Sequence, residues 1–141
     1  MPPNIQHSEN DAPFWDGAQR GELLVQACAA CGRLRFPPRT MCPWCQSFEA
    51  NWKPLSGNGT IWSFIVPHPP LLPPFDSLAP YNVVVVALDE DPGIRMVGNL
   101  VASAGGAINQ VPAAEIQIGA AVSVVFQAAG AGAVIPRWTL R

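Results

Sequence analysis

A set of four cysteines, arranged as two Cys-x-x-Cys pairs, constrains this chain more than any other feature. The cysteines are Cys28, Cys31, Cys42 and Cys45. Two such pairs supply the closed tetrahedral ligand set of a structural zinc site, and Gly32 suits the positive φ needed after the first pair. We expect one zinc ion, with iron as the alternative that the same sulfurs could hold. A closed site has no open position for a substrate, so the metal is not expected to catalyse a reaction.

Composition limits the class of protein. The chain has 141 residues, of which 49% are hydrophobic and 13% are charged, and these values exclude a disordered chain. Its 16 prolines and 12 glycines favour short strands and turns over long helices. The net charge of −2 lacks the basic excess that is typical of nucleic-acid-binding proteins.

The cellular location is inferred from signals that the sequence lacks. No segment reaches the ~18 consecutive apolar residues of a membrane span. The N-terminus has no basic region followed by an apolar run, as a secretory signal would have. We therefore expect a cytoplasmic protein with no membrane partner, in which paired cysteines are metal ligands rather than disulfides.

The N-terminal part of the chain is expected to hold one helix and two short strands. Residues 1–10 are polar and are expected to form a loose leader. A short helix is predicted over 12–20, with Asp11 as its N-cap. Strands are predicted at 23–26 and 34–36, on either side of the first cysteine pair.

A turn-forming run at 56–59 is predicted to divide the chain into two domains, 1–56 and 57–141. The second domain is expected to be all β, with a hairpin turn at 91–93. Its predicted strands are 60–66, 81–88, 94–101, 122–126 and 134–140. The second strand contains four consecutive valines, which favours a strand buried on both faces. Five short strands with a long connection after the third match a five-stranded OB-fold barrel, and a plain β-sandwich fits almost as well.

A proline-rich segment, 67–80, is predicted to be a rigid apolar loop between the first two strands of that barrel. Its six prolines stiffen it and prevent sheet pairing. Four large apolar side chains lie between the prolines: Leu71, Leu72, Phe75 and Leu78. If they are exposed together, they form a partner-binding or substrate-facing surface. If they fold inward, they cap the barrel, and the sequence leaves both alternatives open.

Several short motifs occur in a fixed order along the chain. They are Phe14-Trp15-Asp16-Gly17, Cys28-Ala29-Ala30-Cys31-Gly32, Phe36-Pro37-Pro38-Arg39, Cys42-Pro43-Trp44-Cys45, Gly59-Thr60-Ile61-Trp62-Ser63, Ile118-Gly119 and Pro136-Arg137-Trp138. Together they resemble the family that joins an N-terminal helix and a rubredoxin-like zinc ribbon to a C-terminal OB-fold, long catalogued as the domain of unknown function number thirty-five. The resemblance covers the chain from Phe14 to Trp138 and implies a mainly β protein with that domain order.

The same resemblance implies an accessory role in acyl-CoA metabolism. Relatives associate with thiolase-like enzymes, including lipid-transfer-protein-type thiolases and aldolases that shorten steroid side chains, and help to hold the CoA ester. For this chain it implies a noncatalytic subunit that docks on such an enzyme and binds or positions an acyl-CoA substrate. Two alternatives are an OB-fold protein that binds single-stranded nucleic acid and a free-standing acyl-CoA enzyme.

Arginines and tryptophans are the remaining candidates for binding and packing roles. Arg33, Arg35 and Arg39 lie close together in the ribbon and could hold CoA phosphates, because arginine forms bidentate bonds to phosphate. They could equally be solvated charges or pair with a partner protein. Trp15 and Trp44 are expected to pack the helix and the ribbon together.

Catalytic motifs are the last signal to weigh. The chain has no nucleophile elbow, zinc-protease, Walker or dinucleotide-binding motif, and its four cysteines are committed to metal. The sequence therefore predicts no catalytic residue. Whether the chain alone is an enzyme stays open at this point.

Overall fold

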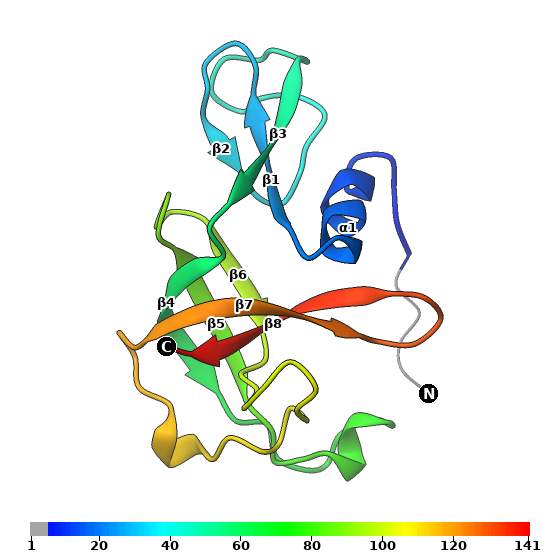
Figure 1. Cartoon of the computed structure of the whole chain (residues 1–141), viewed down its shortest axis with the longest axis vertical. Helices are drawn as coiled ribbons and strands as arrows, with labels where there is room; N and C mark the ends of the chain where they lie inside the picture. The colour runs from blue at the N-terminus through cyan, green and yellow to red at the C-terminus, as the bar shows by residue number, and fades with distance from the viewer. Residues whose placement is uncertain (1–5) are drawn as a thin grey trace.

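The chain folds into two antiparallel sheets, one after the other along the sequence (Figure 1). The structure is a computed structural model that describes residues 6–141. The first sheet has three strands and carries the cysteine loops, and the second has five strands curled into a barrel. The mainly β fold predicted from the sequence is confirmed. The predicted leader falls partly on residues 1–5, which lie outside the described residues.

Helix α1, Ala12–Gln19, begins and ends within one residue of its predicted bounds. Asp11 stands at the N-cap position, as predicted, but its side chain makes no capping hydrogen bond. Its Oδ1 instead accepts hydrogen bonds from the Ser8 amide at 2.6 Å and the Ser8 hydroxyl at 3.0 Å. Gly17 lets the helix pack closely on the next strand, because a Cβ there would lie 2.7 Å from Leu24 Cγ.

The three-stranded sheet has the order β2-β1-β3. Its strands are β1 (Leu23–Cys28), β2 (Leu34–Arg35) and β3 (Ala50–Leu55), and β1 is buried throughout. β3 pairs with β1 along its whole length. β3 is absent from the predicted strands because it contains Pro54 and polar residues, and only Trp52 and Leu55 are even partly buried.

The five-stranded sheet has the order β6-β5-β4-β7-β8 and curls so that its two edges meet (Figure 1). Its strands are β4 (Asn58–Ile65), β5 (Val83–Leu88), β6 (Arg95–Gly98), β7 (Ala121–Ala128) and β8 (Val134–Leu140). A parallel bridge between Leu100 and Trp138 closes the seam, and Val101 N donates to Trp138 O at 2.8 Å. The OB-fold prediction is therefore confirmed, and the plain β-sandwich is excluded.

The barrel encloses the larger apolar core. Its largest side chains with at most 1% of their surface exposed are Ile61, Val84, Val86, Leu88, Leu100, Val101, Val122 and Trp138. Side chains of a strand alternate between its two faces, so Val84 and Val86 point to the core. Val83 and Val85 are only half-buried. The prediction of a strand buried on both faces is therefore wrong, because one face of this sheet points away from the core.

Loops at both ends of the barrel connect its strands. The segment 67–80 joins β4 to β5 and contains one short 3-10 turn, Phe75–Ser77. The predicted hairpin between β5 and β6 is confirmed by Ile94 N, which donates to Asp91 O at 2.9 Å. None of the helices in residues 6–141 is both long and apolar enough to span a membrane.

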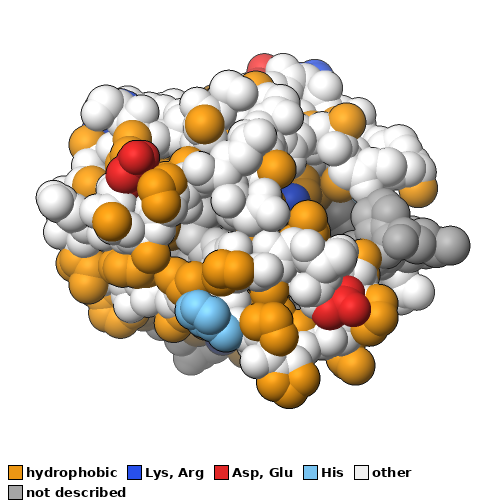
Figure 2. Space-filling model, turned by 90° about the horizontal axis from the view of Figure 1, so that it is seen from below, with side chains coloured by type: hydrophobic (Ala, Val, Ile, Leu, Met, Phe, Trp, Pro, Cys, Tyr) orange, Lys and Arg blue, Asp and Glu red, His pale blue; other side chains and the backbone are white. Residues whose placement is uncertain are grey.

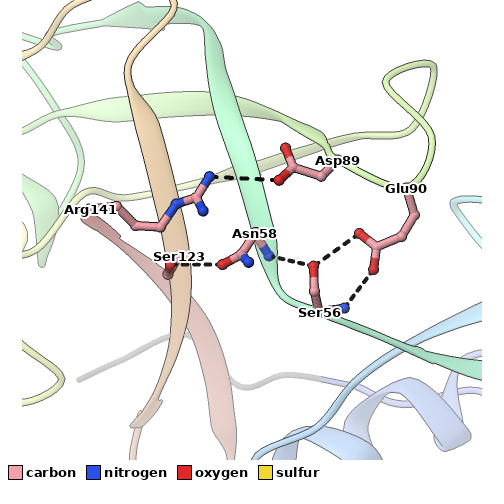
Figure 3. A network of polar contacts seen from close by, with 6 residues as sticks. All are labelled: Ser56, Asn58, Asp89, Glu90, Ser123 and Arg141. Carbon is pink, nitrogen blue, oxygen red and sulfur yellow. Dashed lines mark hydrogen bonds and ion pairs between the residues drawn. The ribbon is translucent and has the colours of Figure 1, made fainter.

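Two residues, Ser56 and Gly57, join the two sheets between β3 and β4. The Glu90 carboxylate accepts hydrogen bonds from the Ser56 amide at 2.6 Å and the Ser56 hydroxyl at 3.1 Å (Figure 3). The Ser56 hydroxyl in turn accepts one from the Asn58 amide at 3.1 Å. Gly57 has a φ of 81° and its carbonyl accepts a bond from Val124 N at 2.8 Å. The barrel therefore holds this connection from both sides.

Candidate metal centre and the predicted binding residues

The four cysteines lie on two loops with the same backbone conformation. In the first loop Gly32 N donates to Cys28 O, and in the second Gln46 N donates to Cys42 O, both at 2.9 Å. The residue after each pair is left-handed, with a φ of 78° at Gly32 and 62° at Gln46. This confirms the positive φ expected at Gly32 and adds Gln46 as its counterpart. The two loops thus present their cysteines to a common point.

The sulfur positions fit one tetrahedral ion. Cys28 Sγ lies 3.5 Å from Cys45 Sγ, and Cys31 Sγ lies 3.7 Å from Cys42 Sγ. All four Sγ atoms lie within 4.8 Å of one another. With Zn–S bonds of about 2.3 Å, a regular tetrahedron places its sulfurs about 3.8 Å apart. The separations suit four thiolates on one zinc ion, and they exceed the roughly 2.0 Å of a disulfide.

The ionisation of these thiols also favours a bound cation. The Cys31 amide donates to Cys28 Sγ at 3.4 Å and is the main cause that lowers the pKa of the Cys28 thiol to about 6. The Ser47 amide favours the thiolate of Cys45, but the Cys28 sulfur and burial outweigh it and raise the pKa of Cys45 to about 11. Four thiols so close together do not all ionise without a positive charge, which a metal ion supplies.

The three arginines predicted to hold phosphates occupy different environments. Arg35 is buried, and its Nη2 donates to Arg39 O at 3.2 Å. Arg33 lies over the ring of Trp44, with its guanidinium carbon 5.2 Å from the ring centre. Arg33 and Arg39 are exposed. Two of the three side chains can therefore reach a ligand in solution, whereas Arg35 supports the backbone of the loop between the cysteine pairs.

Gln26 holds this loop in place, although no sequence motif marks it. Its Oε1 accepts hydrogen bonds from Arg35 Nε at 2.7 Å and from the Arg39 amide at 2.8 Å. The Gln26 side chain is buried within β1. A single amide in the otherwise apolar segment 23–27 is the signal that could have identified it, because buried polar groups need partners.

The proline-rich loop exposes one large apolar side chain and holds the others partly inward. Leu72 is 83% exposed. The half-buried members of the set are Leu71, Phe75 and Leu78. Phe75 packs against Tyr81, with ring centroids 5.8 Å apart. Figure 2 views the molecule from the end where this loop lies in Figure 1, and that face shows many hydrophobic and few charged side chains.

The two tryptophans expected to pack the helix against the ribbon behave differently. Trp15 contacts Phe14 edge-on and stacks on His7, with ring centroids 5.1 Å and 5.2 Å away. Trp44 is 49% exposed, so the packing role predicted for it is wrong. Phe14 and Phe36, whose ring centroids lie 5.7 Å apart, make the aromatic contact between helix and ribbon instead.

Two family models match the chain, one over its N-terminal part and one over most of the remainder. The first is described as the rubredoxin-like zinc ribbon domain of ChsH2 and matches residues 15–49. The second is described as the C-terminal OB-fold domain of ChsH2 and matches residues 52–127. The first match includes all four cysteines, so the metal centre is the structural zinc site of such a ribbon.

Individual relatives are similar over parts of the chain. A "Probable enoyl-CoA hydratase alpha subunit" of Thermomonospora curvata is 44% identical over 92 residues, which is 64% of this chain and 28% of that protein. A "DUF35 domain-containing scaffold protein" of Methanothermobacter thermautotrophicus is 33% identical over 110 residues, which is 77% of this chain and 74% of that protein. The chain therefore spans less than a third of the hydratase subunit that it matches.

A solved structure described as "Ltp2-ChsH2(DUF35) aldolase" is similar over the whole fold. The superposition has a TM-score of 0.82 at 31% sequence identity, and it covers 97% of this chain and 98% of that chain.

Proposed function

The chain belongs to the DUF35 family, in which a rubredoxin-like zinc ribbon precedes an OB-fold, and on that premise we propose that it is a noncatalytic accessory subunit. It docks on a thiolase-like or lipid-transfer-protein-type catalytic subunit and helps to bind or position an acyl-CoA substrate. A thiolase or a retro-aldolase of steroid side-chain degradation is the kind of enzyme meant. The proposal places the complex in the cytoplasm, where thiols stay reduced and available to zinc.

The similarity to the chain of the Ltp2-ChsH2(DUF35) aldolase carries this proposal. It extends over nearly the full length of both chains, and that protein's description pairs the DUF35 component with a second component in an aldolase. The names "alpha subunit" and "scaffold protein" of the sequence relatives support a role within an assembly. The closed four-sulfur geometry of the metal site agrees with a structural rather than a catalytic ion.

The proposal is tested by isolating this chain from its native host together with whatever protein binds it. The chain, the isolated partner and the reconstituted complex are each assayed for acyl-CoA turnover. We expect no turnover by the chain alone, and a partner that is weakly active or insoluble without it. A partner equally active with and without the chain would reject the accessory role, and salt-dependent binding of a single-stranded oligonucleotide would favour the nucleic-acid alternative.

We assign docking to the proline-rich loop, with Leu72 at its centre. Water does not favour a leucine that is 83% exposed among other apolar side chains, and such patches mark interfaces. The prolines around Leu72 reduce the entropy that the loop loses when a partner binds it. Leu71, Phe75 and Leu78 support the loop from half-buried positions.

Three variants separate docking from capping of the barrel. Leu72→Asp should stay folded and lose the partner, because the side chain touches little of its own chain. Phe75→Ser should also lower the melting temperature, because it removes the contact with Tyr81. Phe48→Asp is the matched control, since Phe48 is 69% exposed but belongs to the ribbon. Unchanged affinity of Leu72→Asp for the partner would remove the loop from the interface.

We assign the CoA phosphates to the two exposed arginines of the ribbon, Arg33 and Arg39. Arg35 contributes indirectly, because its hydrogen bond to the Arg39 carbonyl holds the backbone of Arg39 in place. In the isolated complex, Arg39→Gln should weaken acyl-CoA binding about tenfold, the loss of one charge-assisted bond. Lys53→Gln, an equal loss of charge at an exposed position on β3, should not. Titration calorimetry measures the affinity of each variant for acyl-CoA. Equal losses of affinity in both variants would mean that Arg39 contributes only its charge and makes no specific bond to the phosphates.

A further inference from the structure

A groove lies between the two edge strands of the barrel, β6 and β8, next to the bridge that Leu100, two residues after β6, forms with Trp138 of β8. It has a volume of about 530 Å³, within the range of small-molecule sites. Helix α1, the ribbon, the proline-rich loop and three barrel strands all contribute to its walls. The walls are largely apolar and include five aromatic side chains: Phe14, Trp15, Phe36, Phe75 and Tyr81. The proposed docking and CoA contacts leave this groove without a role.

Arg137 lines the groove and is held there by two neutral amide side chains. Its Nε donates to Gln127 Oε1 at 3.1 Å, and its Nη1 donates to Asn99 Oδ1. The nitrogen of Gln127 donates to Ala104 O at 2.9 Å and Gly106 O at 2.7 Å. The nitrogen of Asn99 donates to Asn82 O at 2.5 Å. Both amide oxygens are therefore fixed toward the guanidinium.

This guanidinium makes no ion pair with any described residue. The ion pairs within residues 6–141 are those of Arg20 with Glu22 and of Arg141 with Asp89. Burial lowers the pKa of Arg137, although arginine stays charged at neutral pH. Its Nη2 donates to no residue in the described part of the chain. A half-buried cation with free donors is thus oriented by neutral groups, which leaves its charge available to a ligand.

The charges around the groove favour an anion. Its described lining residues include two arginines, Arg95 and Arg137, and no acidic residue. Arg95 lies over the ring of Trp62 at 3.8 Å from its centre, so Arg137 is the cation left without an aromatic or acidic partner. A ligand that matches these walls has an apolar body and a single anionic head that accepts bidentate bonds.

We infer that this groove binds an apolar carboxylate, with the carboxylate on Arg137 and the apolar body against the aromatic walls. The ligand is a free acid rather than a CoA thioester, because a thioester has no negative charge next to its apolar chain. The inference is tested on this chain alone, without the partner enzyme. Its test can therefore succeed or fail whatever the outcome of the copurification that tests the proposed function.

The first experiment needs no substitution. Decanoate, decanol and decanoyl-CoA are titrated into the zinc-loaded chain by calorimetry, below the concentrations at which micelles form. We expect decanoate to bind at least about tenfold more tightly than decanol, since the two differ in the charge that Arg137 would contact. Decanol binding as tightly as decanoate would overturn the inference. Binding of decanoyl-CoA without binding of decanoate would also overturn it, because the ligand of the groove would then be the thioester.

Two variants then locate the site. Arg137→Gln should weaken decanoate binding at least about tenfold and leave decanol binding unchanged. Arg141→Gln is the matched control, because Arg141 directly follows β8 but pairs with Asp89. Ile135→Trp should block the groove for both ligands, although Arg137 is still present. This variant tests the site even if Arg137→Gln fails to fold. Full decanoate affinity in a folded Arg137→Gln or Ile135→Trp protein would refute the assignment.

Discussion

The ribbon and the barrel are stabilised by different means. In the ribbon, large apolar side chains near the cysteine loops remain in water, with Trp44 49% and Phe48 69% exposed. In the barrel, Ile61, Leu100 and Trp138 are fully or almost fully buried. The four cysteines converge in the part of the chain that has fewer fully buried apolar side chains. A three-stranded sheet of this size buries too little apolar area to fold securely by itself, so a metal ion replaces part of a core.

Loss of the metal should have the largest effect, and it should destabilise the ribbon but not the barrel. Cys42→Ser should unfold the ribbon, because structural zinc supplies on the order of 10 kcal/mol of apparent folding free energy. Met41→Ser, a substitution at the neighbouring exposed position, should have little effect. Elemental analysis and amide hydrogen exchange would show zinc lost and β1 unprotected while β5 stays protected. A reduced, folded ribbon without metal would contradict the comparison.

A cavity in the barrel core should destabilise the protein and leave the metal site intact. Ile61→Ala should destabilise the protein by about 2–5 kcal/mol, because it removes a fully buried side chain from the core. Ile118→Ala is the control, since Ile118 is 66% exposed. Urea denaturation measures the difference, and zinc content should stay at one ion per chain. Loss of zinc from the folded Ile61→Ala protein would mean that the metal site depends on the barrel core, which would contradict the comparison.

The contact between α1 and β1 offers a smaller test of how the ribbon is supported. Gly17→Ala should cost about 1–3 kcal/mol, because the new Cβ would lie 2.7 Å from Leu24 Cγ and overpack the contact. Gly105→Ala is the control, since no atom lies within 4 Å of a Cβ built there. If both variants melt at the same temperature, the close approach of the helix adds nothing to the ribbon.

The smallest expected effect compares the two cysteine loops with each other. Gly32→Ala should destabilise the ribbon by about 1–2 kcal/mol, because an L-residue is strained at a φ of 78°. Gln46→Gly should stabilise it by up to about 1 kcal/mol, because it relieves the same strain at a φ of 62°. Thermal unfolding of the zinc-loaded proteins would show shifts of opposite sign. Shifts of the same sign would mean that the loops are not equivalent.

Local patterns were sufficient to predict the metal site and most of the strands. Each Cys-x-x-Cys pair carries its own geometry, and the five barrel strands are marked by runs of apolar residues. The division at residues 56 and 57 stays a prediction. β3 lies beyond local signals because its pairing with β1 joins residues up to 32 positions apart, from Leu23 opposite Leu55. No pattern within β3 itself records that partner.

Side-chain environments were harder to predict than elements. Arg35 looks like an exposed charge in the sequence, but Gln26 holds it in a buried position. Asp11 stands at the predicted N-cap position, yet its carboxylate accepts a hydrogen bond from the Ser8 amide and none from the first turn of the helix. The groove around Arg137 draws its walls from helix α1, the residue after β2, the barrel strands and the loop between β4 and β5. Such features depend on tertiary packing, which no short window of sequence contains.

The connection at Ser56 and Gly57 has a consequence for the entropy of association. The barrel holds these two residues through Glu90 on one side and Val124 on the other, so β3 continues into β4 with little freedom to swivel (Figure 3). A protein that touches the ribbon and the barrel at once meets a surface whose two halves already have a fixed orientation. Binding then restricts no hinge between them, and the free energy of its contacts is not reduced by that loss of freedom.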